Sequence, residues 1–180
     1  GVAPREVGLV VHGTTLATNA LIERKGARTA LVTTAGFRDS VEIAWEHRFD
    51  QYDLLMERPE PLVPRRLRLG VRERLRADGS VETPLDRASL AVAIDRLQAE
   101  GVASVAIAFL HAWRDKRHEH AAADAVRRAM PDAYVTCSAD VLPQIKEFER
   151  FSTTAVNAYV GPVVSRYLER LAGRLEAAGY

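Results

Sequence analysis

The first concentration of residues that could do chemistry lies near the start of the chain, between an apolar run and a helix-like stretch. Its members share groups suited to holding an anion or a carbonyl oxygen: His12, Gly13, Thr14, Thr15 and Asn19. An imidazole moves protons near neutral pH, hydroxyls hydrogen-bond, and glycine allows a close backbone approach. Asn19 follows Thr15 by one helical turn and can face the same side. The spacing indicates an anion or carbonyl pocket, or alternatively only a threonine N-cap.

A second concentration lies near the C-terminal end, within about three turns of a predicted helix. It combines two carboxylates, one guanidinium, three hydroxyls and one amide: Glu147, Glu149, Arg150, Ser152, Thr153, Thr154 and Asn157. Serine and threonine are mildly unfavourable inside helices because they compete for backbone hydrogen bonds. The cluster therefore suits the polar wall of a cleft. It equally suits hydroxyls that bond back to the preceding turn, and both interpretations stay open.

The elements that would position the first cluster form a predicted β-α-β unit. Residues 7–11 are an unbroken apolar run, as expected for a strand buried on both faces of a parallel sheet. Residues 16–25 have helical composition, Gly26 is a typical helix end, and residues 30–34 form a second strand-like run. In open α/β sheets, ligands bind at the carboxyl ends of strands, where a helix begins. This placement favours the pocket interpretation.

Residues 65–83 are predicted to form a hairpin. Apolar and arginine side chains alternate along it, and Asp78-Gly79 is a strong two-residue turn signal. The arginine face could bind phosphates or acidic ligands. Glu73 and Glu82 dilute its charge, which favours the alternative of a solvated face that is protected from edge pairing.

The remaining chain alternates helices and strands. Asp86 is a predicted N-cap of an apolar-striped helix that ends at Gly101, and the strand-like residues 102–109 lead to Leu110-His111, again a polar residue at a strand's carboxyl end. A helix from 115 to 130 and a strand at 133–138 complete a predicted parallel arrangement. Two helices then follow, at 144–159 and from Gly161-Pro162 to Gly179.

Two further candidates for chemistry have simpler interpretations. The histidines of His118-Glu119-His120 are two positions apart and point to different sides of a helix, so we predict solvated first-turn residues and no metal site. Cys137 lies in an apolar strand and is predicted to be a small core residue.

Composition limits the class of protein. The chain has 180 residues, of which 47% are hydrophobic and 27% charged, which is typical of a globular protein. Its 25 basic and 24 acidic residues give no reason to expect nucleic acid or a membrane surface as a partner. A single cysteine and the lack of a signal-peptide pattern favour the cytoplasm. The chain opens on glycine rather than methionine, so we expect a piece of a longer protein.

Three stretches together carry a resemblance to a known family. Residues 10–43, VVHGTTLATNALIERKGARTALVTTAGFRDSVEI, are similar to the early segment of the hydantoinase A / 5-oxoprolinase family, which also includes acetone carboxylase β-type subunits. Residues 61–86 resemble the region that follows in that family. Residues 141–168, VLPQIKEFERFSTTAVNAYVGPVVSRYL, resemble its E-[YF]-E-R-x-S-T-T-x-x-N-A-Y-x-x-P stretch.

The resemblance implies an ATP- and Mg²⁺-dependent enzyme of actin/sugar-kinase-like architecture. Such enzymes open cyclic amides such as 5-oxoproline or N-methylhydantoin, or carboxylate ketones, through phosphorylation of a carbonyl oxygen. The implied fold is α/β, a mostly parallel sheet with flanking helices plus an antiparallel hairpin. Residues 1–143 would form the N-terminal domain and residues 144–180 a helical segment leading into an actin-like domain. A second subunit type or a homo-oligomer is the implied partner.

The same resemblance implies roles for both clusters. The turn Gly13–Thr15 would hold a phosphate or the activated carbonyl oxygen, His12 would shuttle a proton, and Arg150 would neutralise phosphoryl charge. Asn19, Lys25 and the polar residues from Glu147 to Asn157 are the other matching positions.

The family's glycine-rich D-x-G-G-T hairpin would precede Gly1, and its larger actin-like half would follow Tyr180. We therefore expect little or no turnover from this chain alone. Two alternatives remain: a ketone-phosphorylating carboxylase subunit, and a non-catalytic module that docks through residues 57–64 and the arginine hairpin.

Overall fold

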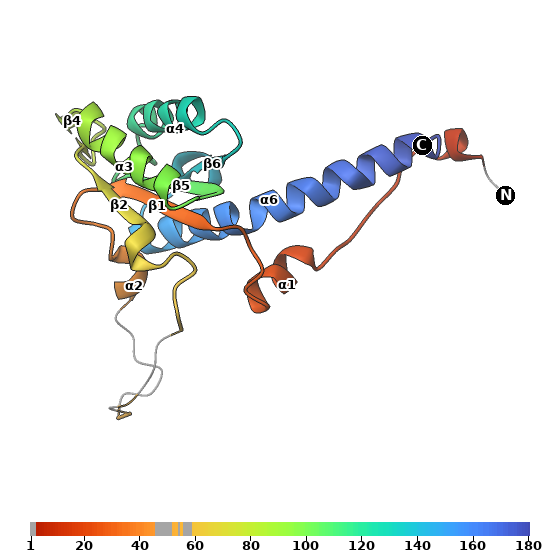
Figure 1. Cartoon of the computed structure of the whole chain (residues 1–180), viewed down its shortest axis with the longest axis horizontal. Coiled ribbons are helices and arrows are strands. Elements are labelled where there is room, and N and C mark those ends of the chain that lie inside the picture. The colour runs from red at the N-terminus through yellow and green to blue at the C-terminus, as the bar shows by residue number, and fades with distance from the viewer. Residues whose placement is uncertain (1–2, 46–51, 54, 56–58) are drawn as a thin grey trace.

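The computed structural model describes residues 3–45, 52, 53, 55 and 59–180, which form an α/β body with a long helix and an N-terminal arm projecting from it (Figure 1). The elements in chain order are η1 (Pro4–Glu6, a 3-10 helix), α1 (Leu16–Ile22), β1 (Thr29–Thr34), α2 (Ser40–Ile43), η2 (Arg65–Leu67, also 3-10), β2 (Arg68–Val71), β3 (Arg74–Leu75), β4 (Val81–Thr83), α3 (Arg87–Ala99), β5 (Ser104–Ala108), α4 (Arg117–Ala129), β6 (Tyr134–Cys137), α5 (Ser138–Val141) and α6 (Glu147–Ala177). Within these residues, no helix is both long and apolar enough to cross a bilayer.

The body is built on a four-stranded parallel sheet in the order β2-β1-β5-β6, with a separate antiparallel pair β3-β4. All residues of β1 and β5 are buried, so the apolar runs predict these strands correctly. Helices α3 and α4 lie together above the sheet and α6 begins beneath it in Figure 1. The prediction of a mostly parallel α/β sheet with flanking helices and an antiparallel hairpin is confirmed.

Helix α3 follows its sequence signals closely. The carboxylate of Asp86 accepts hydrogen bonds from the backbone N–H groups of Ala88 (3.3 Å) and Ser89 (3.2 Å), as an N-cap does. The predicted apolar stripe is buried, and Gly101 adopts φ = +59° just beyond the end of the helix. Capping and periodicity thus define this element.

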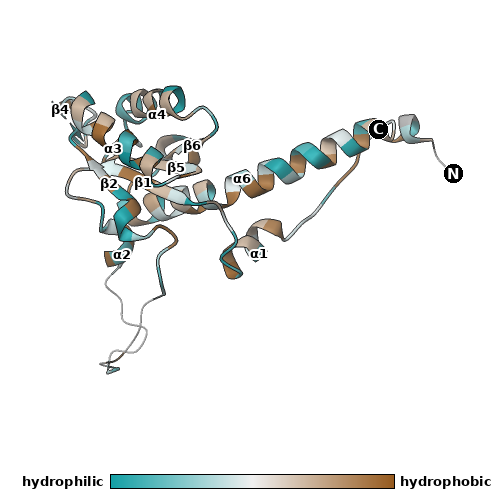
Figure 2. Ribbon diagram, viewed as in Figure 1, coloured by the Kyte–Doolittle hydropathy of each residue, from teal (hydrophilic) through white to brown (hydrophobic). Residues whose placement is uncertain are grey.

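The predicted first strand, residues 7–11, is wrong. These residues form no strand but an arm beside the far half of α6 (Figure 1), and Leu9 and Val11 are 79% and 85% exposed. Figure 2 shows hydrophobic stretches along this arm and on α1. An apolar, β-branched run becomes a buried strand only when a neighbouring strand pairs with it, and no strand among the described residues does so. The β-α-β unit therefore does not form.

The end of α1 also differs from the prediction. The helix ends at Ile22, and Arg24 rather than Gly26 takes the left-handed conformation, with φ = 54°. A glycine is needed at position 26 for a different reason, which is close packing. A Cβ there would lie 2.1 Å from the ring of Tyr159, while the next residue donates its N–H to the Tyr159 carbonyl at 2.9 Å. Gly26 thus lets the chain after α1 pack directly on α6.

The predicted hairpin at 65–83 is only partly correct. Its first half is β2, which pairs in parallel with β1, and only β3 and β4 form a hairpin, closed by Gly79 at φ = +89°. Alternation of side chains is the same in a parallel edge strand and a hairpin, so the pattern does not distinguish them. Arg68 faces inward, 2% exposed, and donates to the carbonyl of Val63 and the carboxylate of Glu42.

Helix α6 runs through Pro162 without the predicted break. Proline has no N–H, so the carbonyl four residues earlier, on Ala158, loses its helical donor. The buried hydroxyl of Ser104 on β5 replaces that donor, with its Oγ 2.6 Å from the Ala158 oxygen. A strand side chain thus satisfies the carbonyl that the proline leaves without a partner.

Replacing Ser104 by alanine is therefore expected to lower the free energy of unfolding by about 1–3 kcal/mol, because it leaves a buried carbonyl without a donor. Urea denaturation followed by circular dichroism measures this change. Ser165→Ala, on the half-buried part of the same helix, is the control and should change stability by less than about 0.5 kcal/mol. A cost for Ser104→Ala no larger than that of the control would contradict the replacement role.

Candidate functional site

A crevice with a volume of about 540 Å³ opens at the carboxyl edge of the parallel sheet. Its walls come from the segments that follow β1, β2 and β5, from α2, and from the start of α6. The lining residues are Phe37, Ser40, Ile43, Ala44, Trp45, Arg74, Leu110, His111, Lys146, Glu147, Phe148 and Glu149. This is the position at which open parallel sheets bind ligands.

The backbone of the crevice is held in unusual conformations. Among the described residues, four that are not glycine have positive φ, and three of these line the crevice: Ala44 (52°), His111 (55°) and Lys146 (79°). Such conformations cost free energy and tend to gather at functional sites, where the surrounding structure holds them in place. Their concentration here supports a binding role for the crevice.

The walls combine aromatic rings with cations. The rings of Trp45 and Phe148 meet edge to face, with centroids 6.0 Å apart. The Lys146 ammonium lies 5.2 Å from the centroid of the Trp45 ring, and the Arg74 guanidinium lies 5.2 Å from that of Phe37. Two carboxylates in the first turn of α6 add the opposite charge. The crevice can therefore hold an apolar ring that carries a polar group.

Beneath the crevice, buried hydrogen bonds join the ends of three strands. The Thr34 hydroxyl at the end of β1 accepts from the Leu110 N–H at 3.0 Å and donates to the carboxylate of Glu73. The other oxygen of Glu73 lies 2.8 Å from Nδ1 of His118. His118 and Glu119 are buried, so the prediction that they are solvated first-turn residues is wrong; only His120 is exposed. The helical pattern could not show that strand ends would cover α4.

A second buried network centres on Glu119. One of its oxygens accepts from the Phe109 N–H (2.8 Å) and the Ser138 hydroxyl (2.5 Å), and the other accepts from the Ala139 N–H (2.8 Å). Nη1 of Arg150 donates to the Phe109 carbonyl and to Ser138, and lies 3.7 Å from the Glu119 carboxylate. Both charged side chains are fully buried. The network fixes the start of α6 against β5 and α5.

Burial shifts the pKa values of Glu119 and Arg150 in opposite directions. It raises the pKa of Glu119, against the effect of its hydrogen bonds to Ser138, Ala139 and Phe109. It lowers the pKa of Arg150, against the attraction of Glu119, Glu147 and Glu73. Nε and Nη2 of Arg150 have no hydrogen-bond partner among the described residues, and Nη2 lies 3.8 Å from the Glu147 carboxylate on the crevice wall. Arg150 therefore supports the crevice from below and does not line it.

The members of the second predicted cluster, between residues 147 and 157, lie in different surroundings. Glu147 and Glu149 line the crevice, whereas Arg150 lies beneath it. The hydroxyls of Ser152 and Thr154 donate to carbonyls of the preceding helical turn, Phe148 and Arg150, both at 2.6 Å. The remaining two members are apart from the crevice: Thr153 is exposed, and Asn157 accepts from the Tyr134 hydroxyl at 3.3 Å.

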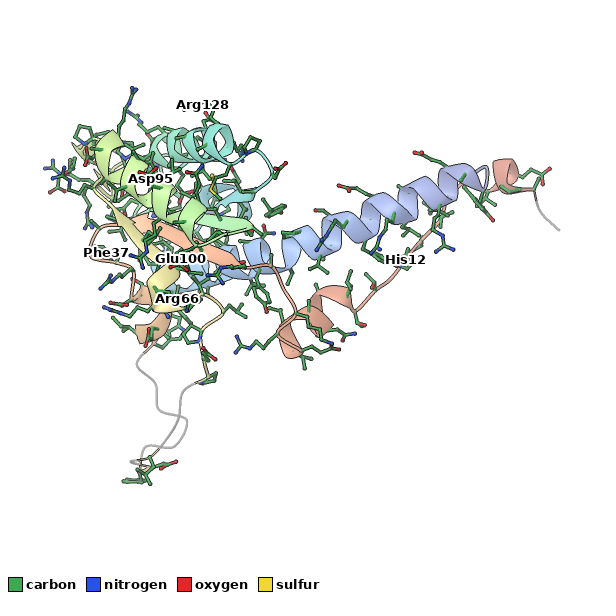
Figure 3. The ribbon with its side chains drawn as sticks, viewed as in Figure 1. His12, Phe37, Arg66, Asp95, Glu100 and Arg128 are labelled. Atoms are coloured by element: carbon green, nitrogen blue, oxygen red, sulfur yellow. The ribbon has the colours of Figure 1, made fainter. Side chains whose placement is uncertain are left out.

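The first predicted cluster lies on the arm, well away from the crevice. Figure 3 shows His12 beside the far half of α6, whereas Phe37 lies on the body. All five members are exposed: His12, Gly13, Thr14, Thr15 and Asn19. Nε2 of His12 lies 2.6 Å from the Tyr167 hydroxyl. The Thr14 hydroxyl accepts from the Leu16 N–H, and the Thr15 hydroxyl accepts from the Asn19 amide. The structure does not bring this cluster together with Arg150.

Sequence reasoning placed His111 at the end of a strand and included Glu147 and Glu149 in a candidate site, but it missed the other side chains of the crevice. Phe37, Arg74 and His111 each follow the end of a parallel strand by three residues. That shared spacing is a usable signal, because carboxyl ends of parallel strands meet at one edge. The contributions of Trp45 and Lys146 come from loops whose course the sequence pattern does not predict.

The fold and the crevice define an α/β protein with a ligand site at the carboxyl edge of a parallel sheet. The sequence pattern of the hydantoinase/oxoprolinase N-terminal region matches residues 1–130, and the chain belongs to this family. It is 43% identical over 173 residues to caprolactamase subunit alpha of Pseudomonas jessenii, covering 95% of this chain and 25% of that protein.

Two solved structures resemble the chain. The crystal structure of the ATP-dependent caprolactamase from Pseudomonas jessenii matches 98% of this chain and 26% of its own, with a TM-score of 0.91 and 42% identity. The nucleotide-free structure of acetone carboxylase matches 91% and 25%, with a TM-score of 0.78 and 26% identity. The chain thus spans about a quarter of the length of these relatives, and it carries their fold over nearly all of its own length.

Proposed function

We propose that the chain forms part of an ATP-dependent hydrolase of cyclic amides and that the crevice receives the amide ring. The observation that carries this proposal is the crevice itself, an aromatic and charged site at the carboxyl edge of a chain that is 43% identical to a caprolactamase subunit. The edge-to-face pair Trp45–Phe148 would pack on the ring. Arg74 and Lys146 would face its carbonyl oxygen, where negative charge develops during acyl transfer.

The residues present fit ATP with Mg²⁺ by their chemistry. Arg74 and Lys146 have the charge to hold phosphate, and the carboxylates of Glu147 and Glu149 are oxygen ligands of the kind that Mg²⁺ prefers. When bound, ATP would supply a phosphoryl group for the carbonyl oxygen of the amide. Arg150, behind Glu147, would keep the first turn of α6 in position.

The exposed turn on the arm would serve a separate purpose in the longer enzyme. Gly13, Thr14 and Thr15 present backbone and hydroxyl groups to solvent, and a Cβ on Gly13 would meet nothing within 4 Å. We propose that this turn, with His12 and Asn19, holds a phosphate or an activated oxygen supplied by a different part of the enzyme. In this chain alone it takes no part in binding the ring.

Two related proposals concern the whole protein. A second subunit type is supported by the relative's description as a subunit alpha. A cytoplasmic location is supported by the single cysteine, Cys137, which is buried and forms no disulfide.

Two alternative functions each have a specific observation in their favour. The match to acetone carboxylase favours a subunit that phosphorylates a ketone, although its identity is lower, 26% against 42%. The exposed apolar residues of the arm, including Leu9 and Val11, favour a docking module. The predicted docking segment 57–64 lies partly outside the described residues. Of the arginines in and between β2 and β3, Arg68 and Arg72 are in ion pairs and Arg74 is stacked on Phe37.

Calorimetric titration of the chain with ε-caprolactam, 5-oxoproline and acetone distinguishes the first two functions. We expect the lactams to bind and acetone not to bind. Phe148→Ala should weaken lactam binding by about five- to tenfold, because removing an aromatic contact of about 1–1.4 kcal/mol changes a dissociation constant by that factor. His12→Ala is the matched control, an exposed imidazole outside the crevice, and should change binding by less than about twofold.

Different results would contradict the proposed ring site and the proposed hydrolase activity. Equal lactam binding by Phe148→Ala and the unchanged chain would remove the crevice as the ring site. Lactam binding that weakens in His12→Ala instead would assign the ring to the arm. In the full-length protein with its partner subunit, phosphate release from ATP that depends on acetone but not on a lactam would overturn the hydrolase proposal.

A further inference from the structure

A cluster of three potential metal ligands lies outside the crevice lining. Its members come from the first turn of α4, the last residue of β6 and the helix α5: His120, Cys137 and Asp140. One ligand atom from each lies within 4.8 Å of the other two. Nε2 of His120 and Oδ2 of Asp140 are 3.0 Å apart. A tetrahedral ion with bonds of about 2.0–2.3 Å fits between atoms at such separations with small side-chain movements.

The electrostatic surroundings of the thiol favour a cation. The carboxylates of Glu119, Asp140 and Asp124 lie near the sulfur, and the guanidinium of Arg127 opposes them. This surplus of negative charge attracts a metal ion to the same place. Lys116 does not block the site, because its ammonium bonds to Oδ1 of Asp140, 2.9 Å away, and leaves Oδ2 toward the histidine.

This arrangement also has the supporting contacts that metal ligands usually have. A ligating carboxylate is normally held by a second hydrogen bond, which here is the bond from Lys116. The free thiol donates to the Glu119 carbonyl at 3.7 Å, a hydrogen bond that is given up when the metal replaces the proton. His120 and Asp140 keep half of their side-chain surface exposed, so an ion can enter from solvent.

We propose that His120, Cys137 and Asp140 bind Zn²⁺, with water as the fourth ligand. A thiolate, an imidazole and a carboxylate are the mixed soft and hard ligand set that suits this ion. On binding, the sulfur–hydrogen bond breaks, the proton goes to solvent, and sulfur forms a bond to the metal without any change of oxidation state. The ion would join α4 to the junction of β6 and α5, beside the buried Glu119, and so would act on stability.

Titration of the chain with Co²⁺ tests this proposal, because a thiolate bound to Co²⁺ gives a charge-transfer absorption band. We expect the band to appear in the unchanged chain and to disappear when Zn²⁺ displaces the cobalt. Cys137→Ser should abolish the band. His120→Ala and Asp140→Asn, both at exposed positions where folding is least affected, should each weaken metal binding by about tenfold or more.

The control is His12→Ala, which removes another exposed imidazole and should leave metal binding unchanged. Zn²⁺ should raise the melting temperature of the unchanged chain and not that of His120→Ala. The absence of the band in the unchanged chain, or unaltered Co²⁺ affinity in both His120→Ala and Asp140→Asn, would overturn the proposal and leave the cluster as a set of ion pairs. Neither result bears on lactam binding in the crevice.

Discussion

Glu119→Leu is expected to lower the free energy of unfolding by about 3–5 kcal/mol, the range for removing one member of a buried ion pair. The change removes the acceptor for the N–H groups of Phe109 and Ala139 and for the Ser138 hydroxyl. It also leaves the buried guanidinium of Arg150 without its closest buried carboxylate. Equilibrium urea unfolding, followed by circular dichroism, gives the value.

Two further variants make this expectation specific. The double variant Glu119→Leu/Arg150→Met should be less destabilised than the sum of the single variants, because it removes the unpaired charge as well. Glu169→Gln, on the exposed part of α6, should change stability by less than about 0.5 kcal/mol. Additive costs for the two single variants would show that the buried charges do not interact.

Gly161→Ala and Gly173→Ala are expected to change stability in opposite directions, although both lie in α6. A Cβ at position 161 would lie 2.5 Å from the ring of Tyr134, so overpacking should cost about 1–3 kcal/mol. A Cβ at position 173 would meet nothing within 4 Å among the residues that the structure describes, so the better helix propensity of alanine should stabilise by about 0.5–1 kcal/mol. Thermal and urea unfolding of the two variants give the comparison.

Removal of the ring tests the cause. Gly161→Ala combined with Tyr134→Ala should cost less than the sum of the two single changes, because the clash requires both side chains. A stabilising Gly161→Ala would show that Tyr134 moves aside freely and that the close approach is not needed.

The sequence predicts the interior of the body well and its edges poorly. Buried runs such as 30–34 and 102–109 become strands, and Asp86 caps its helix, because these signals depend on local chemistry. Residues 7–11 are equally apolar, but no strand in the described part of the chain lies beside them. The alternating side chains of β2 predict a hairpin strand, but β2 pairs in parallel with β1. Pairing between distant segments decides both cases, and local patterns do not contain it.

The candidate site was accessible to sequence reasoning where a residue follows a strand and where Glu147 and Glu149 belong to the polar cluster of a helix. His111 could be placed at the sheet edge in this way, but the backbone conformation of Lys146 and the contact of Trp45 with Phe148 depend on loops that meet only in the folded chain. Arg150 stood out by its charge within a helix. Its burial beside Glu119 could not be predicted, because the partner lies on a different helix.

The proline within α6 divides that helix in a way that the continuous ribbon does not suggest. Up to Gly161 the helix has buried residues and is tied to β5 through Ser104, whereas none of its residues after Pro162 is buried. The far half of the helix projects from the body (Figure 1). Opening of the first part must disrupt the sheet, whereas the second part can open without disturbing it. One uninterrupted coil therefore contains two cooperative units, and the proline marks the boundary between them.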